Sequence, residues 1–325
     1  MGYGSYSQSA ADKLAADRAT LSRNEVFRQR GCHPLMDPKG LLVRECRDSA
    51  EHPESLGIVF ALDVTGSMGS IPDLLARQEL PEFMKLLGAL AIRDPQVMFM
   101  AIGDATNDDA PLQVGQFETT AELMDQWLTW SYLEGGGGGT GSESYELAFY
   151  TLAQHTDLDC WVKRRKRGYL FMTGDELPYP VVSRHQVGAL IGETLDEDIP
   201  LEEVVSAAAE TYHLFFLIPD LKRRKACEAR WRQVLGDHVI CMESPADTCA
   251  VAAAIVGLTE RVLPDVDAVA RALAAHGIDR QRVAATVRAL QPYADLLDPQ
   301  APRSVFAHLP SMLPARPAWW KRLFG

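Results

Sequence analysis

The chain has 325 residues, of which 47% are hydrophobic and 23% charged, enough for one large hydrophobic core or two modest ones. Its 44 acidic and 32 basic side chains give a formal net charge of −12, which argues against binding to a nucleic-acid backbone and favours a cation as partner. No apolar run is long enough to cross a bilayer, the composition of residues 1–10 does not predict a secretory signal, and the six cysteines form no C-x-x-C pair. These features predict a cytoplasmic protein with no nucleic-acid partner and no stable membrane insertion.

The N-terminal region differs in composition from the rest of the chain. Residues 8–30 are polar, rich in Ala and basic residues, and free of Gly and Pro, which predicts one solvated helix. Pro34, Pro38 and Gly40 then interrupt the pattern, and residues 32–53 have the composition of an irregular lead-in. We therefore expect an N-terminal helical arm with its lead-in over residues 1–54.

Strand and helix patterns alternate over residues 55–260. Continuous apolar runs predict buried strands at residues 57–62, 96–102, 169–172, 213–218 and 238–241, and an alternating pattern at 112–117 predicts an edge strand. Helical patterns lie between them, near residues 80–87, 121–130, 143–155, 201–211, 222–234 and 246–258. This order predicts an α/β domain with a Rossmann-like, doubly wound, mostly parallel sheet and one antiparallel edge strand.

Residues 261–325 are predicted to form a small C-terminal helical appendage that ends in an aromatic tail. Val266, Val269 and Leu273 recur at helical spacing in Ala-rich sequence. The tail carries Trp319 and Trp320, which either pack on the domain itself or anchor a partner.

Three polar clusters lie at the predicted carboxyl ends of strands or at the start of a helix. They are residues 63–69 (DVTGSMG) after the first buried strand, residues 139–141 (GTG) at the end of a glycine-rich run, and residues 173–176 (TGDE) after the strand YLFM. In open α/β sheets, ligands bind outside the carboxyl ends of the strands. The three clusters therefore predict one site.

The side chains in these clusters are hard oxygen donors. Hydroxyls come from Thr65, Ser67 and Thr140, and carboxylates from Asp63 and Asp175. Mg²⁺ prefers such ligands and often keeps water in its shell. We predict a site for one divalent cation, Mg²⁺ or alternatively Mn²⁺ or Ca²⁺, with an open coordination position.

D-V-T-G-S, the later G-G-T and the acidic residue after the next core strand together resemble the metal-ion-dependent adhesion site of von Willebrand factor type A (VWA) domains, over residues 55–260. The resemblance implies direct metal contacts from Thr65, Ser67 and Thr140. It also implies that Asp63 and Asp175 act largely through water, and that a partner protein donates a carboxylate to the open position.

The third cluster departs from the family pattern. The family has Asp immediately after the Thr that ends the strand, whereas Gly174 intervenes here. Asp175 and Glu176 are therefore alternatives for the last acidic group.

A second resemblance points to an enzyme. D-V-T-G-S is also similar to the phosphorylated loop of haloacid-dehalogenase-type phosphotransferases, and residues 103–108 (GDATND) match their acidic motif. In that alternative Asp63 is the nucleophile, and Asp104 and Asp108 help to hold Mg²⁺. The acidic motif, however, precedes T-G-D instead of following it, and Thr65 stands where soluble phosphatases need a general acid. We therefore expect a non-enzymatic protein and retain the Mg-dependent phosphotransferase as the alternative.

The favoured function is metal-dependent protein binding by an adaptor or scaffold. Intracellular bacterial members of the VWA family work beside AAA+ ATPases of the MoxR type, so the resemblance implies such an ATPase as a candidate partner.

Replacing Thr140 by Ala is expected to weaken divalent-cation binding markedly, because it removes one of three hydroxyl donors. Titration calorimetry with Mg²⁺ measures the effect. Unchanged affinity would remove Thr140 from the site.

Overall fold

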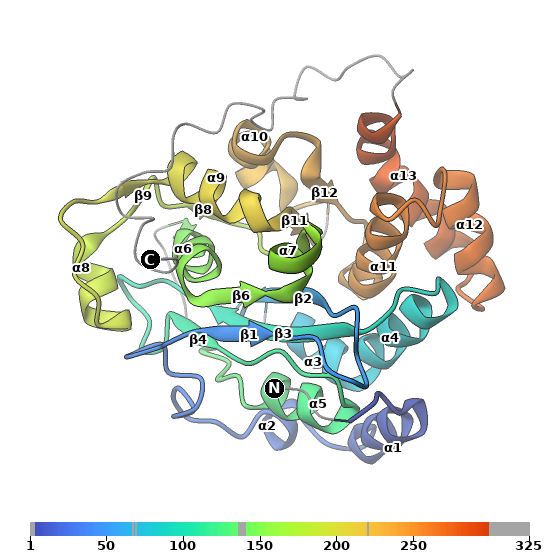
Figure 1. The fold of residues 1–325 in the computed structure, drawn as a ribbon, viewed down its shortest axis with the longest axis horizontal. Coiled ribbons are helices and arrows are strands. Elements are labelled where there is room, and N and C mark those ends of the chain that lie inside the picture. The colour runs from blue at the N-terminus through green and yellow to red at the C-terminus, as the bar shows by residue number, and fades with distance from the viewer. Residues whose placement is uncertain (1–3, 67, 69, 136–140, 220, 299–325) are drawn as a thin grey trace.

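The computed structural model describes residues 4–66, 68, 70–135, 141–219 and 221–298. A six-stranded sheet with the order β12-β11-β7-β2-β3-β4 forms its centre (Figure 1). Neighbouring strands are parallel except for β4, which is antiparallel to β3 at one edge. The strands are β2 (Leu56–Asp63), β3 (Pro95–Ile102), β4 (Leu112–Val114), β7 (Gly168–Thr173), β11 (Tyr212–Ile218) and β12 (Val239–Cys241). The predicted α/β, doubly wound, mostly parallel sheet with one antiparallel edge strand is confirmed.

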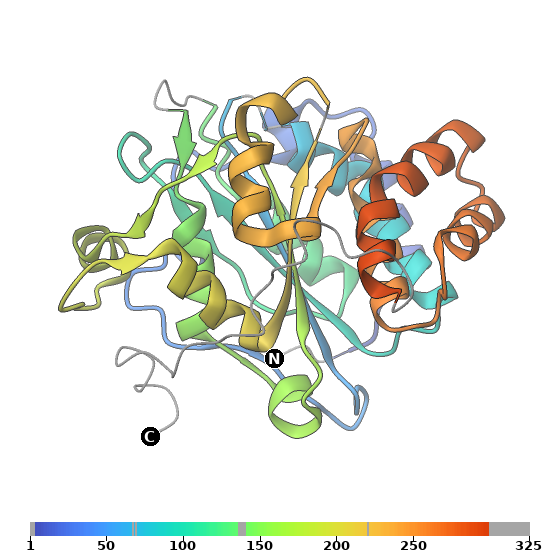
Figure 2. The same cartoon turned by 90° about the horizontal axis from the view of Figure 1, so that it is seen from above.

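Helices cover both faces of this sheet. On one face α4 packs against α11, and on the other α6 packs against α9 (Figure 2). A π-helical turn, η1 (Leu75–Glu79), joins α3 to α4. The helices between the strands are α3 (Ser70–Leu74), α4 (Leu80–Ala89), α5 (Ala121–Thr129), α6 (Tyr145–His155), α7 (Asp159–Arg164), α9 (Leu201–Thr211), α10 (Arg224–Leu235) and α11 (Thr248–Thr259). The helices predicted in this region lie within a few residues of these bounds.

The strands are apolar along their whole length because both faces of the sheet are covered. Every residue of β2 is buried. On the α4 face Phe60 meets Phe83 edge to face at 5.1 Å and lies 5.5 Å from Phe171. On the other face Trp231 of α10 stacks on Phe216 of β11 at 3.8 Å. Each such aromatic residue adds roughly 1.5–3 kcal/mol of burial, and this packing holds the strand ends in place.

The prediction of one helix over residues 8–30 is wrong. The structure has α1 (Gln8–Arg18) and a short α2 (Arg23–Val26). The break has a local cause: Ser22 and Glu25 form a capping box that starts a new helix, with the Ser22 amide 2.7 Å from the Glu25 carboxylate. The arm also packs on the domain, since α1 contacts α4 and α5 and Arg18 pairs with Asp125.

Two further helices, α12 (Val266–Ala275) and α13 (Arg280–Leu297), pack against each other and against α11. Tyr293 of α13 is buried against Phe215 and His238, and the Arg282 guanidinium donates to Asp247 at 2.7 Å. The predicted aromatic tail with Trp319 and Trp320 lies outside the described residues. Among those that the structure describes, no helix is long and apolar enough to span a membrane.

Three short ribbons join segments in which the sequence patterns predict no strand. They pair β1 (Arg44–Cys46) with β6 (Thr156–Leu158), β5 (Ser142–Glu143) with β8 (Leu177–Pro178), and β9 (Val181–Val182) with β10 (Ile199–Pro200). A short helix, α8 (Arg184–Gln186), lies between β9 and β10, and turns η2 (Val187–Ile191), η3 (Gly236–His238) and η4 (Pro245–Asp247) complete the described elements.

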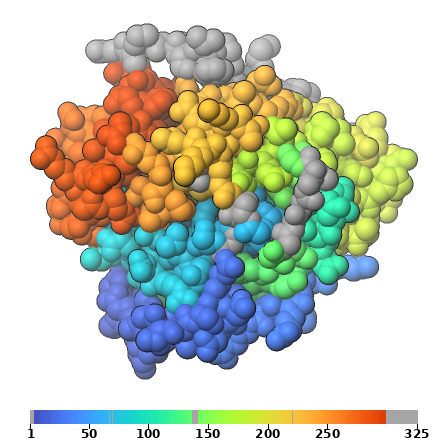
Figure 3. Space-filling model, turned by 180° about the vertical axis from the view of Figure 1, so that it is seen from behind, coloured from blue at the N-terminus to red at the C-terminus, as the bar shows by residue number. Residues whose placement is uncertain are grey.

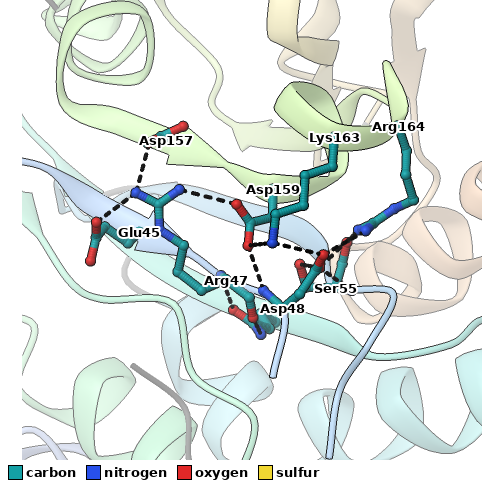
Figure 4. Close-up of polar contacts among 9 residues, drawn as sticks. Glu45, Arg47, Asp48, Ser55, Asp157, Asp159, Lys163 and Arg164 are labelled. Atoms are coloured by element: carbon teal, nitrogen blue, oxygen red, sulfur yellow. Dashed lines mark hydrogen bonds and ion pairs between the residues drawn. The ribbon is translucent and has the colours of Figure 1, made fainter. Parts of the chain in front are cut away.

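An ion-pair network at the amino end of β2 attaches the lead-in to α7 (Figure 4). Asp48 lies at its centre. Its carboxylate accepts from the Arg164 guanidinium at 2.7 and 3.0 Å and from the Ser55 hydroxyl at 2.7 Å, and Lys163 lies 3.2 Å away. Burial opposes ionisation of Asp48, but the hydrogen bonds from Arg164, Ser55 and Lys163 outweigh it and hold the pKa of Asp48 well below its usual range.

Asp48 therefore stabilises the fold above about pH 4, and this contribution is lost as the pH falls below the unfolded-state pKa. We expect Asp48→Asn to lower the free energy of unfolding at pH 7 by about 2 kcal/mol and to reduce its fall between pH 5 and pH 2. Urea unfolding across this range measures both effects. Asp17→Asn, at an exposed position in α1, is the matched control, and equal curves for the two variants would contradict a stabilising role.

Candidate metal centre

The direction of winding reverses between β2 and β7, which opens a crevice at their carboxyl ends. From β2 the chain passes to β3 on one side, whereas β7 lies on the other. Asp63 ends β2, and Thr173 ends β7. The β5–β8 ribbon, with a 3.2 Å hydrogen bond from the Leu177 amide to the Gly141 carbonyl, brings Gly141, the last residue of the second cluster, beside the third cluster.

Asp63 is fully buried, and both of its carboxylate oxygens accept hydrogen bonds. Oδ1 accepts from the Thr65 amide at 3.0 Å and the Thr65 hydroxyl at 2.6 Å, and Oδ2 accepts from the Tyr145 hydroxyl at 2.7 Å. Burial raises the pKa of Asp63 to about 7, and the nearby charge of Asp175 acts in the same direction, while the bonds from Thr65 and Tyr145 oppose the rise. A cation bound here would favour the charged carboxylate.

Tyr145 explains the departure from the family pattern at Gly174. A methyl group added to Gly174 would lie 2.2 Å from the Tyr145 hydroxyl oxygen and 2.6 Å from the ring carbon that bears it. The phenol therefore crosses the position that any larger side chain at residue 174 would occupy. Gly174 stands there because the tyrosine must pass over it to reach Asp63.

Asp175 lies near Asp63 and forms an ion pair with Arg223. The Arg223 guanidinium also approaches the sulfur of Met68, which belongs to the first cluster, at 3.9 Å. This arginine, just before α10, therefore joins the first and third clusters. No sequence signal singled it out beyond its place in a basic run.

Further polar and acidic groups lie near Asp63. Glu143 is 1% exposed, and its Oε2 has no hydrogen-bond partner among the described residues. Burial, followed by the charges of Asp63 and Glu176, raises the pKa of Glu143 to about 10. The hydroxyl of Thr173 is likewise buried without a partner in the described part of the chain. Sequence reasoning missed Glu143, at the end of β5, and Tyr145, the first residue of the buried helix α6, although both lie within a few residues after the glycine-rich run.

In the GDATND loop, residues 103–108, the carboxylates of Asp104 and Asp108 accept hydrogen bonds from nearby groups. Asp104 accepts from the Thr106 hydroxyl at 2.7 Å, from Asn107 at 2.7 Å and from the Tyr179 hydroxyl at 2.9 Å. Asp108 accepts from the Asp104 amide at 2.7 Å. These carboxylates shape the loop after β3, and nothing in this arrangement supports the phosphotransferase alternative.

The structure thus brings together three of the five predicted ligands, Asp63, Thr65 and Asp175. Ser67 and Thr140 lie outside the described residues. Within the described ranges, no three His, Cys, Asp or Glu side chains are grouped so that they alone could hold a metal. The donor set nevertheless fits a hard cation, because a hydroxyl and carboxylates meet at one edge of the sheet beside buried oxygens that lack partners.

No family model and no curated protein matches this sequence. Solved structures that resemble it include the pilus adhesin SpaC from Lactobacillus rhamnosus GG in its open conformation (10% identity, TM-score 0.40, 69% of this chain and 31% of the adhesin). Proximal thread matrix protein 1 from the mussel byssus (9%, TM-score 0.39, 67% and 49%) and a von Willebrand factor type A protein from Catenulispora acidiphila (11%, TM-score 0.39, 62% and 42%) are also similar. This chain spans only 31–49% of their lengths. Similarity at this level does not indicate a function, so the function is inferred from this chain's own residues.

We expect Gly174→Ala to displace Tyr145 from Asp63 and to destabilise the protein by about 1–3 kcal/mol, because a buried aromatic ring has no room to move. Gly88→Ala in α4 is the matched control, since a methyl group there meets no atom within 4 Å. Thermal unfolding compares the two variants. Equal stability would show that Tyr145 does not constrain residue 174.

Proposed function

We propose that this chain is a metal-dependent protein-binding module of the VWA type. One divalent cation, Mg²⁺ or alternatively Mn²⁺ or Ca²⁺, binds at the carboxyl end of β2 and captures a carboxylate of a partner protein. The observation that carries the proposal is the Asp63–Thr65 pair, held by Tyr145 at the point where the sheet changes its winding direction.

The hydrogen bond between Thr65 and Asp63 suits this role. The Thr65 hydroxyl donates its proton to Asp63 at 2.6 Å, so the oxygen lone pairs are free to face a cation. In the proposal Ser67 and Thr140 supply the other hydroxyls. Asp63 and Asp175 act through bound water, and Glu176 remains the alternative to Asp175.

Such a site is better suited to binding an anion than to catalysing a reaction. A cation held mainly by neutral hydroxyls keeps much of its positive charge, and an open position then attracts a carboxylate. Asp63 is buried and bonded at both oxygens, which suits a supporting group better than an attacking nucleophile. We therefore propose a non-enzymatic role in the cytoplasm, with an acidic protein surface as partner. A MoxR-type AAA+ ATPase is the candidate that the family resemblance implies.

Titration calorimetry with Mg²⁺ tests the site directly. We expect one cation per chain and at least a tenfold loss of affinity in Asp63→Asn, about 1.4 kcal/mol, because the variant removes the central charge. Asp17→Asn is the control. An Asp63→Asn variant that binds Mg²⁺ as the wild type does would overturn the proposal, as would hydrolysis of para-nitrophenyl phosphate that Asp63→Asn abolishes.

A further inference from the structure

A cleft of about 300 Å³ opens beside the candidate metal centre, between the N-terminal arm and the loop after β2. Its walls include Arg23, Arg28 and Arg30 from the arm and residues 64–66 from the loop. Thr65, which is 3% exposed, also lines it. Figure 3 shows the arm in dark blue along the lower side of the molecule, below the gold segment that carries α10.

The cleft is basic although the protein carries a net charge of −12. The three arginines are exposed, and none forms an ion pair within the described part of the chain. The Arg28 guanidinium donates to the Glu25 carbonyl at 2.8 Å, which restrains its position. The carboxylate of Glu25 accepts hydrogen bonds from Ser22 and interacts with Arg28 only through its charge, without forming an ion pair with any of the three arginines.

Thr65 belongs both to this cleft and to the candidate metal centre. A ligand that reaches the cation along the cleft must therefore pass the arginines. Arg223 lies on the α10 side of the same loop, where it is paired with Asp175. The arginines of the arm therefore supply the positive charge in the cleft.

We propose that the arm's arginine cleft binds an acidic segment of the partner polypeptide, with further carboxylates next to the one that completes the metal shell. This inference rests on the proposed function, since the metal supplies the first contact. The arginines recognise the neighbouring acidic side chains through charge-assisted hydrogen bonds and thereby select the partner.

A peptide fits the cleft better than a nucleic acid. Stacking of bases requires exposed aromatic faces, and the aromatic residue among the cleft's walls, Phe27, is only 6% exposed. The acidic groups around Asp63, Glu143 and Asp175 also oppose a long polyanion, whereas a few carboxylates can be matched by the cation and the arginines.

The test uses the full chain and a fluorescein-labelled peptide, Gly-Asp-Gly-Glu-Glu-Glu-Gly, with its Asn/Gln counterpart as the neutral control. Fluorescence anisotropy measures binding in Mg²⁺ and in EDTA. The triple variant Arg23→Gln, Arg28→Gln, Arg30→Gln is compared with Arg271→Gln, an exposed arginine of α12. We expect the triple variant to bind the acidic peptide about tenfold more weakly and with a smaller salt dependence.

The outcomes separate this inference from the proposed function. Peptide binding that requires Mg²⁺ but is equally strong in the triple variant would contradict a role for the arginine cleft. It would still agree with the proposed metal centre. Binding that is equal in EDTA but lost in the triple variant would support the cleft and contradict the proposed function. Absence of peptide binding, or a thymidine oligonucleotide bound more tightly through the same arginines, would overturn the inference. Circular dichroism and Mg²⁺ titration of the triple variant verify that it is folded and retains one cation site.

Discussion

The candidate metal centre is arranged around one carboxylate that is buried at the end of the central strand. Asp63 has no access to water, so its charge must be stabilised by neighbouring groups. Thr65 does this from the loop after β2, and Tyr145 does it from the start of α6. Because the Tyr145 phenol passes over residue 174 to reach Asp63, that residue has to be glycine. The need to stabilise the Asp63 carboxylate therefore accounts for Thr65, Tyr145 and Gly174, which lie in three separate segments of the chain.

The charges around this carboxylate are unevenly distributed. Acidic groups gather at the strand ends, where Glu143 is buried and its pKa is raised. Without a cation, burial and the neighbouring charges favour the protonated forms of Glu143 and Asp63, and a bound cation would favour their charged forms. Positive groups lie outside this cluster, with Arg223 on one side and the arm's arginine cleft on the other. Such an arrangement is suited to a cation at the centre and an acidic ligand above it.

The amino and carboxyl ends of the sheet differ in the polar groups that they carry. At the amino end, Arg47, Asp48 and Arg164 belong to a network that joins the lead-in to α7 (Figure 4). The charged side chains of that network form ion pairs, and the pairing stabilises the fold. At the carboxyl end several buried oxygens lack partners among the described residues. Unsatisfied polar groups of this kind are tolerated where a ligand is to bind.

Local sequence patterns are sufficient to specify the layered architecture. Continuous apolar runs such as that of β2 can be buried only in a sheet covered on both faces, so their order specifies strands and crossovers. The same patterns identify Asp63 and Thr65, because residues that follow a strand within two positions are placed by the strand itself. Contacts from distant segments, in contrast, depend on the tertiary structure. Tyr145 and Arg223 reach the site through packing of α6 and through the segment before α10, and the arm reaches it by folding back on α4 and α5. Local periodicity describes which face of an element is apolar, but it contains no information about which distant side chain will meet a given carboxylate.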